Sequence, residues 1–117
     1  MLFNDFSVRI MQGGLNALSL QQEMILQNLA NADTPGYKAK AVTFRELFNS
    51  ERSRQGRYKL QAVVSEETDP MRPDENTVDT DKESLKLYQN YLQQVALYDK
   101  LGGQFTNMRY VFNQFTK

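Results

Sequence analysis

The sequence predicts a mainly α-helical chain in which long N- and C-terminal helices pair as an antiparallel coiled coil. Two apolar rows with heptad spacing, one near each end, indicate these helices. The segment between them is polar and is expected to be partly irregular or to form short β-strands. We therefore expect three parts, 1–33, 34–79 and 80–117, with the first and last forming one domain. A chain of 117 residues suffices for one small domain.

The N-terminal helix is indicated by apolar residues that recur alternately three and four positions apart. This row comprises Val8, Met11, Leu15, Leu18, Gln22, Ile25 and Leu29, and only Gln22 is polar. Gly13 and Gly14 each disfavour helix by about 1 kcal/mol. We therefore expect a short helix, a break near the glycine pair, and a main helix from about Leu15 to Asn31.

A proline–glycine pair indicates where this helix stops. Thr34 precedes Pro35 and is pushed out of the helical region, and Gly36 can adopt the positive φ that a type II turn requires. The helix is expected to end near Asn31 or Ala32, with a tight turn after it.

The middle segment contains two candidate strands. Residues 41–48 are apolar in an alternating and then mixed pattern, which fits a strand or one short helix. Residues 49–59 are polar and read as a loop. Apolar and other residues then alternate from Tyr58 to Val64, which favours a short strand.

The C-terminal helix carries the longer apolar row. Its members are Leu87, Tyr91, Gln94, Tyr98, Leu101, Phe105, Met108, Phe112 and Phe115, and a second row beside it consists of Leu85, Tyr88, Leu92 and Val95. Thr80 and Glu83 fit a capping box. Gly102 and Gly103 interrupt the row and indicate a kink or a close approach of backbones.

The apolar rows can be read as the core of a helical hairpin or as an assembly surface. Two helices bury one seam between them, so the double row of the C-terminal helix leaves apolar surface for another subunit. The residues expected to form this assembly seam are Leu15, Leu18, Ile25, Leu29, Leu87, Tyr91, Tyr98, Leu101, Phe105, Met108, Phe112 and Phe115.

The composition gives no indication of chemistry. The chain has no histidine and no cysteine, which removes the commonest base, disulfides and thiolate metal sites. Residues 74–85 fail the calcium-loop pattern, because Val78 and Asp79 occupy the fifth and sixth positions. We expect no catalytic residue, no metal ligand, no cofactor and no small-molecule substrate. The formal net charge of zero gives no reason to expect nucleic acid as a partner.

The passage around the turn resembles the signature of flagellar axial proteins, the family of rod, hook and hook-associated proteins. The residues that carry this resemblance are Asn28, Ala30, Asn31, Thr34, Pro35, Gly36, Tyr37 and Lys38. Residues 72–83, Arg-Pro-Asp-Glu-Asn-Thr-Val-Asp-Thr-Asp-Lys-Glu, resemble the segment before the C-terminal helix of a proximal-rod member. The resemblance covers nearly the whole chain.

The resemblance implies a structural subunit of the flagellar rod that is not an enzyme. It implies as partners other copies of the chain, sibling rod proteins, the basal-body adaptor at the membrane ring and the flagellar export apparatus. It implies a location in the periplasm or cell envelope, reached without a cleaved signal peptide; the N-terminus lacks the basic and apolar regions of such a peptide. The alternative is a small helical adaptor or chaperone-like module, which would explain the rows but not the signature passage.

Overall fold

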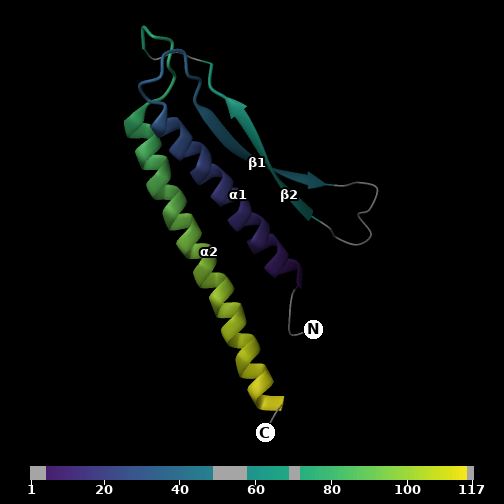
Figure 1. The fold of residues 1–117 in the computed structure, drawn as a ribbon. Coiled ribbons are helices and arrows are strands. Elements are labelled where there is room, and N and C mark those ends of the chain that lie inside the picture. Colours follow the sequence, from purple (N-terminus) through teal and green to yellow (C-terminus); the bar gives the residue numbers. More distant parts are fainter. Residues whose placement is uncertain (1–4, 49–57, 69–71, 116–117) are drawn as a thin grey trace.

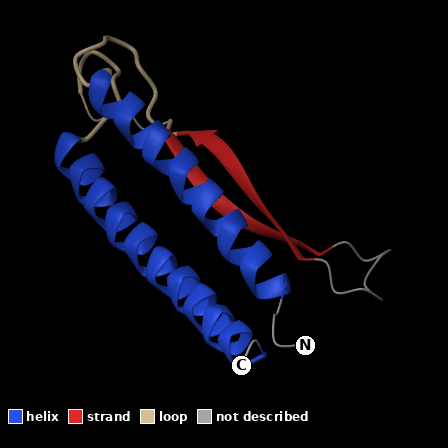
Figure 2. Cartoon of the chain, turned by 60° about the horizontal axis from the view of Figure 1, so that its bottom comes forward, coloured by secondary structure: helices blue, strands red, loops and turns tan. Residues whose placement is uncertain are grey.

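The computed structural model describes residues 5–48, 58–68 and 72–115 and confirms the predicted fold class. Helices α1 (Asp5–Ala30) and α2 (Thr80–Phe115) lie side by side in antiparallel directions, and a two-stranded sheet, β1 (Lys40–Phe48) and β2 (Tyr58–Glu66), lies along α1 (Figure 1). In the view of Figure 2, α1 lies between α2 and the sheet. The molecule is elongated, with extents of 69 × 35 × 14 Å.

Helix α1 is continuous, so the predicted break at the glycine pair is wrong. Packing explains the difference. A Cβ on Gly14 would lie 3.2 Å from Cδ1 of Leu97 in α2, so the missing side chain gives Leu97 room. The turns that follow bury Ala17, Leu18, Met24 and Ile25. Burial of this kind outweighs the intrinsic cost of two glycines.

Helix α2 is also continuous through Gly102 and Gly103, and its start differs from the predicted capping box. Asp79 is the cap: its Oδ1 accepts hydrogen bonds from the backbone N–H groups of Asp81 at 3.1 Å and Lys82 at 3.3 Å. The Glu83 side chain does not reach back to the cap. It is 2% exposed and turns inward to Asn28 of α1. The Glu83 carboxylate, which the capping-box pattern assigned to the start of α2, is therefore bound by Asn28 of the other helix.

The middle segment forms an antiparallel hairpin. Residues 41–48 belong to β1, which decides between the strand and the short helix, and the predicted second strand is confirmed as β2. The register pairs Lys40 with Glu66 at one end and Phe48 with Tyr58 at the other. Most of the predicted loop, residues 49–57, lies outside the described residues.

The seam between α1 and α2 contains more polar contacts than the apolar rows indicated. Asn90, 1% exposed, donates through Nδ2 to the Leu18 carbonyl at 2.8 Å and to Oε1 of Gln21 at 2.9 Å. Gln94 donates to Oε1 of Gln22 at 2.9 Å. These amides hold the two helices in one register, because a shift by one turn would separate every donor from its acceptor.

The predicted α2 row does not form one buried stripe. Its half-buried members are Leu87, Gln94, Leu101 and Met108. The aromatic members Tyr91, Tyr98, Phe105, Phe112 and Phe115 are 52–77% exposed. For Tyr91, Tyr98 and Phe105 the reason is that α2 turns Asn90, Gln94 and Leu97 toward α1, and these aromatic residues lie to one side of that line. Phe112 and Phe115 are five whole turns beyond Gln94 and Leu97 and share their face, but the C-terminal part of α2 extends past the start of α1 (Figure 1).

Candidate functional site

The signature residues meet the second motif at one end of the molecule. There the chain leaves α1, turns into β1, and later returns into α2 (Figure 1). We call this region the junction; it comprises Asn28, Asn31, residues 34–40, residues 72–78 and Glu83. The two passages that the sequence singled out are therefore parts of one structure.

The turn at Pro35–Gly36 has the predicted form. The Tyr37 N–H donates to the Thr34 carbonyl at 3.3 Å, and Gly36 has a φ of 73°, as the third residue of a type II turn requires. The Gly36 N–H donates to the Asp74 carbonyl at 2.8 Å. The turn thus reverses the chain and also binds the second motif.

Asn28 is the fully buried centre of the junction, with an exposure of 0%. Its Nδ2 donates to the Lys40 carbonyl at 2.8 Å and to Oε2 of Glu83 at 3.0 Å. Its Oδ1 accepts from the Lys40 N–H at 2.9 Å and from the Tyr37 hydroxyl at 3.3 Å. One side chain therefore joins α1, the start of β1 and the first turn of α2, and all its hydrogen-bonding groups are used.

Asn76 performs a comparable role at the C-terminal end of α1 and is also 0% exposed. Its Nδ2 lies 2.8–3.1 Å from the carbonyl oxygens of Asn31, Ala32 and Thr34. Its Oδ1 accepts from the Val78 N–H at 2.7 Å. The last carbonyls of a helix have no partner within the helix, and here a residue from a distant segment supplies one.

Further contacts fasten the second motif to the signature passage. Nη2 of Arg72 donates to the Ala32 carbonyl. The Ala39 N–H donates to Oγ1 of Thr77 at 2.7 Å, and Nζ of Lys38 donates to the Glu75 carbonyl at 3.1 Å. Glu75 has a φ of 62°, which lets the segment bend around the turn.

The buried carboxylate of the junction, Glu83, is paired with a lysine of α2. Nζ of Lys86 lies 3.1 Å from Glu83 and 3.6 Å from Glu67. Burial would lower the pKa of Lys86, but its hydrogen bond to Glu83 and the charges of Glu83 and Glu67 outweigh burial and raise the pKa above its usual value. Burial, together with the charges of Glu66 and Glu83, raises the pKa of the Tyr37 hydroxyl.

The other signature residues have lesser contacts. Oγ1 of Thr34 donates to Oδ1 of Asn31 at 3.2 Å, and Nδ2 of Asn31 donates to the Gln27 carbonyl at 2.8 Å. Ala30 and Pro35 are exposed. Sequence reasoning did not single out Asn76, Glu83 or Asn90 as buried anchors. The available signal was the position of Asn90 between the apolar residues Leu87 and Leu97.

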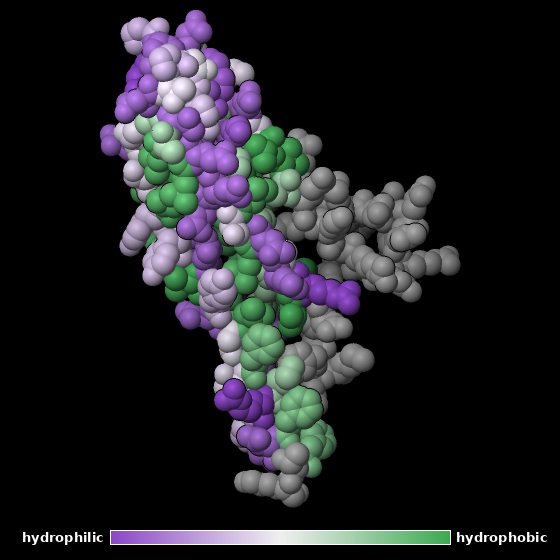
Figure 3. Space-filling view, viewed as in Figure 1, coloured by the Kyte–Doolittle hydropathy of each residue, from purple (hydrophilic) through white to green (hydrophobic). Residues whose placement is uncertain are grey.

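A second feature is the apolar surface that α2 leaves exposed. The exposed large apolar residues of this helix are Leu85, Tyr88, Tyr91, Leu92, Val95, Tyr98, Phe105, Tyr110, Phe112 and Phe115. Figure 3 shows hydrophobic side chains continuing to the lower end of the molecule, where α2 ends. Residues 87–98 include no charged residue. An exposed helix surface that is aromatic and uncharged has the composition of an interface core.

A shallow groove of about 420 Å³ runs along α1 and is lined by Ser19, Gln22, Glu23, Leu26, Gln27 and Ala30. Within the described ranges, acidic side chains form no group of three or more that could hold a metal ion. Neither helix, over its described length, has the apolar character that a membrane crossing requires.

Comparisons with known proteins point to one family. Residues 9–38 match the family model described as "Flagella basal body rod protein". The flagellar basal body rod protein FlgB of Bacillus subtilis is 30% identical over 118 residues, which covers 90% of this chain and 92% of that protein. The FlgB of Salmonella typhimurium is 33% identical over 125 residues, covering 89% and 91%. That of Yersinia enterocolitica is 30% identical and covers 94% and 96%.

Proposed function

The chain belongs to the family of the flagellar basal body rod protein FlgB, a structural component of the rod, and we propose that it polymerises through α1 and α2 in the proximal rod. The observation that carries this proposal is the exposed surface of α2, which is rich in aromatic residues and has no charged residue from 87 to 98. A monomer rarely leaves so much apolar surface to water unless a partner covers it. A small helical adaptor is not favoured, because the relatives that match about 90% of the chain are rod proteins.

The proposed assembly surface follows from the exposures on α2. Tyr91, Tyr98, Phe105, Phe112 and Phe115 are more than half exposed and would contact neighbouring subunits. The buried and half-buried members of the seam would act indirectly, because they hold the surface in shape. These members are Leu15, Leu18, Ile25, Leu29, Leu87, Leu101 and Met108.

The junction would fix the direction in which the hairpin leaves the helix pair. Asn28 contacts both Lys40 of β1 and Glu83 of α2, so the two elements cannot rotate independently. A polymer repeats each contact many times, and a small error in direction would recur at every subunit. The signature residues would therefore serve assembly by fixing the direction of the hairpin relative to α1 and α2.

We further propose the partners and location implied by rod membership. The partners are other copies of the chain, sibling rod proteins, the basal-body adaptor at the membrane ring, and the export apparatus. The location is the cell envelope outside the cytoplasmic membrane, reached without a cleaved signal peptide. The exposed α2 surface and the length matched to rod proteins support this placement.

The experiment is complementation of an in-frame deletion, followed by isolation of basal bodies. We expect the deletion strain to be non-motile and the wild-type chain to restore swimming and to copurify with basal bodies. Phe105→Ala should fail to complement at equal protein level, because the truncation removes an exposed contact. Thr106→Ala, at the next position, is the matched control and should complement. Normal swimming of the deletion strain, or absence of the chain from basal bodies of complemented cells, would contradict the proposal.

A further inference from the structure

Packing within the chain does not explain the glycine pair of α2. A Cβ at Gly102 or at Gly103 would meet no atom of the described residues within 4 Å, so alanine would fit at both positions. Each glycine makes a helix less favourable than alanine does by a factor of about five, which gives about 25-fold for the pair. Helix α2 is therefore weakened at a place where its own packing does not require glycine.

A side chain competes for a backbone hydrogen bond at the same place. Oγ1 of Thr106 donates to the Gly102 carbonyl at 3.0 Å. In an α-helix this carbonyl is also the acceptor for the backbone N–H of Thr106. A threonine that donates to the carbonyl four residues earlier weakens the backbone bonding and often bends the helix. When the backbone bond opens, the hydroxyl keeps the carbonyl satisfied, and water can do the same because Thr106 is exposed.

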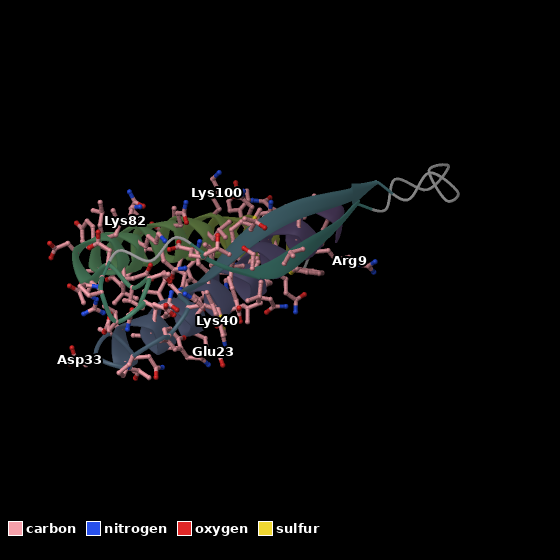
Figure 4. All side chains as sticks on the ribbon, turned by 90° about the horizontal axis from the view of Figure 1, so that it is seen from above. Arg9, Glu23, Asp33, Lys40, Lys82 and Lys100 are labelled. Carbon is pink, nitrogen blue, oxygen red and sulfur yellow. The ribbon has the colours of Figure 1, made fainter. Side chains whose placement is uncertain are left out.

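The weak point lies on the side of α2 that faces away from α1. Thr106 is nine residues beyond Leu97, which packs against α1, and nine residues rotate a helix by about 180°. Gly102 and Gly103 are rotated from Leu97 by about 140° and 120° in opposite directions. Just before the glycines, Lys100 projects outward from α2 (Figure 4). Backbone bonds on this outer side can lengthen in contact with solvent, which is how helices bend.

A bend at the glycines would leave the buried core intact. Among the described residues of α2, the fully buried ones are Glu83 and Asn90, and both precede the glycines. The fully buried residues of α1 lie within 17–28. Because the helices are antiparallel and Gly14 lies beside Leu97, this part of α1 packs against the part of α2 that precedes Leu97.

We propose that α2 bends at Gly102 and Gly103 when the chain joins the rod, so that residues 104–115 swing as one helical segment. The inference deepens the proposed rod function and rests on it. In the free chain the straight form predominates and the bent form is a minor state, which contacts with neighbouring subunits then select. The bend turns the exposed aromatic residues of this segment toward those neighbours without opening the seam between α1 and α2. These residues are Phe105, Tyr110, Phe112 and Phe115.

Amide hydrogen exchange of the free full-length chain tests the hinge. A hinge opens locally, so protection should fall at residues 104–107 and rise again at residues 108–112. Fraying of the helix end would instead lower protection steadily from residue 102 to residue 115. The double variant Gly102→Ala with Gly103→Ala should raise protection at residues 104–107 by about 5- to 25-fold. Gly13→Ala, at a glycine of α1 with equal free space, is the matched control and should leave protection there unchanged.

Swimming of the deletion strain that expresses each variant connects the hinge with assembly. The double variant should unfold at a higher urea concentration than the parent chain but restore swimming poorly, whereas Gly13→Ala should restore it fully. Adding Thr106→Gly to the double variant returns a glycine to the same turn of α2 while both new methyl groups remain, and swimming should recover.

Three results would overturn the inference: a steady fall of protection toward residue 115, normal swimming of the double variant, or no recovery with Thr106→Gly. The last result would show that the added methyl groups block a contact and that bending is not what they prevent. Absence of the parent chain from basal bodies would contradict the rod function itself, whereas the exchange pattern of the free chain does not depend on that function.

Discussion

Asn28 of α1 and Glu83 of α2 are 55 residues apart in the sequence, and their buried side chains are joined by a hydrogen bond of 3.0 Å. The bond connects a signature residue with the first turn of the other helix. The Glu83 carboxylate is also held by Lys86 at 3.1 Å. A buried charge with two donors is tolerated because both donors compensate for lost hydration.

Replacement of Asn28 by alanine should therefore destabilise the fold strongly. The substitution removes one of the two donors to the Glu83 carboxylate and the side chain that pairs with both backbone groups of Lys40. We expect a loss of about 3 kcal/mol or more in the free energy of unfolding. Urea unfolding of dilute protein measures it. Asn107→Ala, at an exposed position of α2, is the control and should change stability by less than about 0.5 kcal/mol. Equal effects would show that the junction is not a stabilising centre.

Asn76→Asp should be more harmful than Asn76→Ala. Aspartate has nearly the same shape, but it replaces a donor with an anionic oxygen beside the carbonyls of Asn31, Ala32 and Thr34. Alanine only removes the donor. Thermal unfolding at neutral pH shows which of the two variants is less stable. Lowering the pH below about 4 should reduce the difference in stability between them, because the aspartate becomes protonated. The reverse order at neutral pH would rule out the carbonyl contacts as the cause.

Gly13→Ala and Gly14→Ala should differ although the residues are adjacent. A Cβ at Gly13 meets no atom within 4 Å, so alanine should stabilise α1 by about 1 kcal/mol through helix propensity. At Gly14 the Cβ lies 3.2 Å from Cδ1 of Leu97, and the required shift should cancel much of that gain. Gly102→Ala, which also meets no atom within 4 Å, is a second control. Equal stabilisation at Gly13 and Gly14 would show that α2 does not press on α1 there.

Stability should decline at alkaline pH. The pKa values of Lys86 and Tyr37 are both raised in the folded state, so the folded chain binds more protons than the unfolded chain. This contribution is complete below the unfolded values of about 10 and 10.4, and it is lost as the pH rises through the raised folded values. Urea titrations at pH 8 and pH 10.5 measure the loss. The double variant Lys86→Gln with Tyr37→Phe should lose less stability between these two pH values than the parent chain. The control Lys100→Gln, at an exposed lysine of the same helix, should lose as much stability as the parent chain.

The parts of the fold that follow from local chemistry could be predicted from the sequence. Heptad spacing indicated both helices, and Pro35 with Gly36 indicated the type II turn. The wrong predictions concerned places where contact with a residue distant in the sequence determines the local structure. Helix α1 continues through Gly14, where it packs against Leu97, and Glu83 binds Asn28 and does not cap α2.

The polar anchors of the junction could not be deduced from the pattern, because an asparagine in a sequence gives no sign of its partner. Asn28 was singled out only through a family resemblance, and Asn76 only as part of a quoted passage. Each has a partner more than 40 residues away. Such contacts belong to the tertiary structure, and hydrophobic periodicity carries no information about them.

The start of α1 at Asp5 and the end of α2 at Phe115 lie at the end of the molecule away from the junction (Figure 1). A force that pulls these two ends apart would separate α1 from α2 progressively, beginning at the end away from the junction. The contact of Gly14 with Leu97 would part first, then Gln22 with Gln94 and Leu18 with Asn90, and the Asn28–Glu83 bond last. Contacts loaded one at a time resist little force, whereas the same contacts sheared together resist much more. The molecule would therefore be mechanically weak along the one direction in which its two chain ends can be pulled apart.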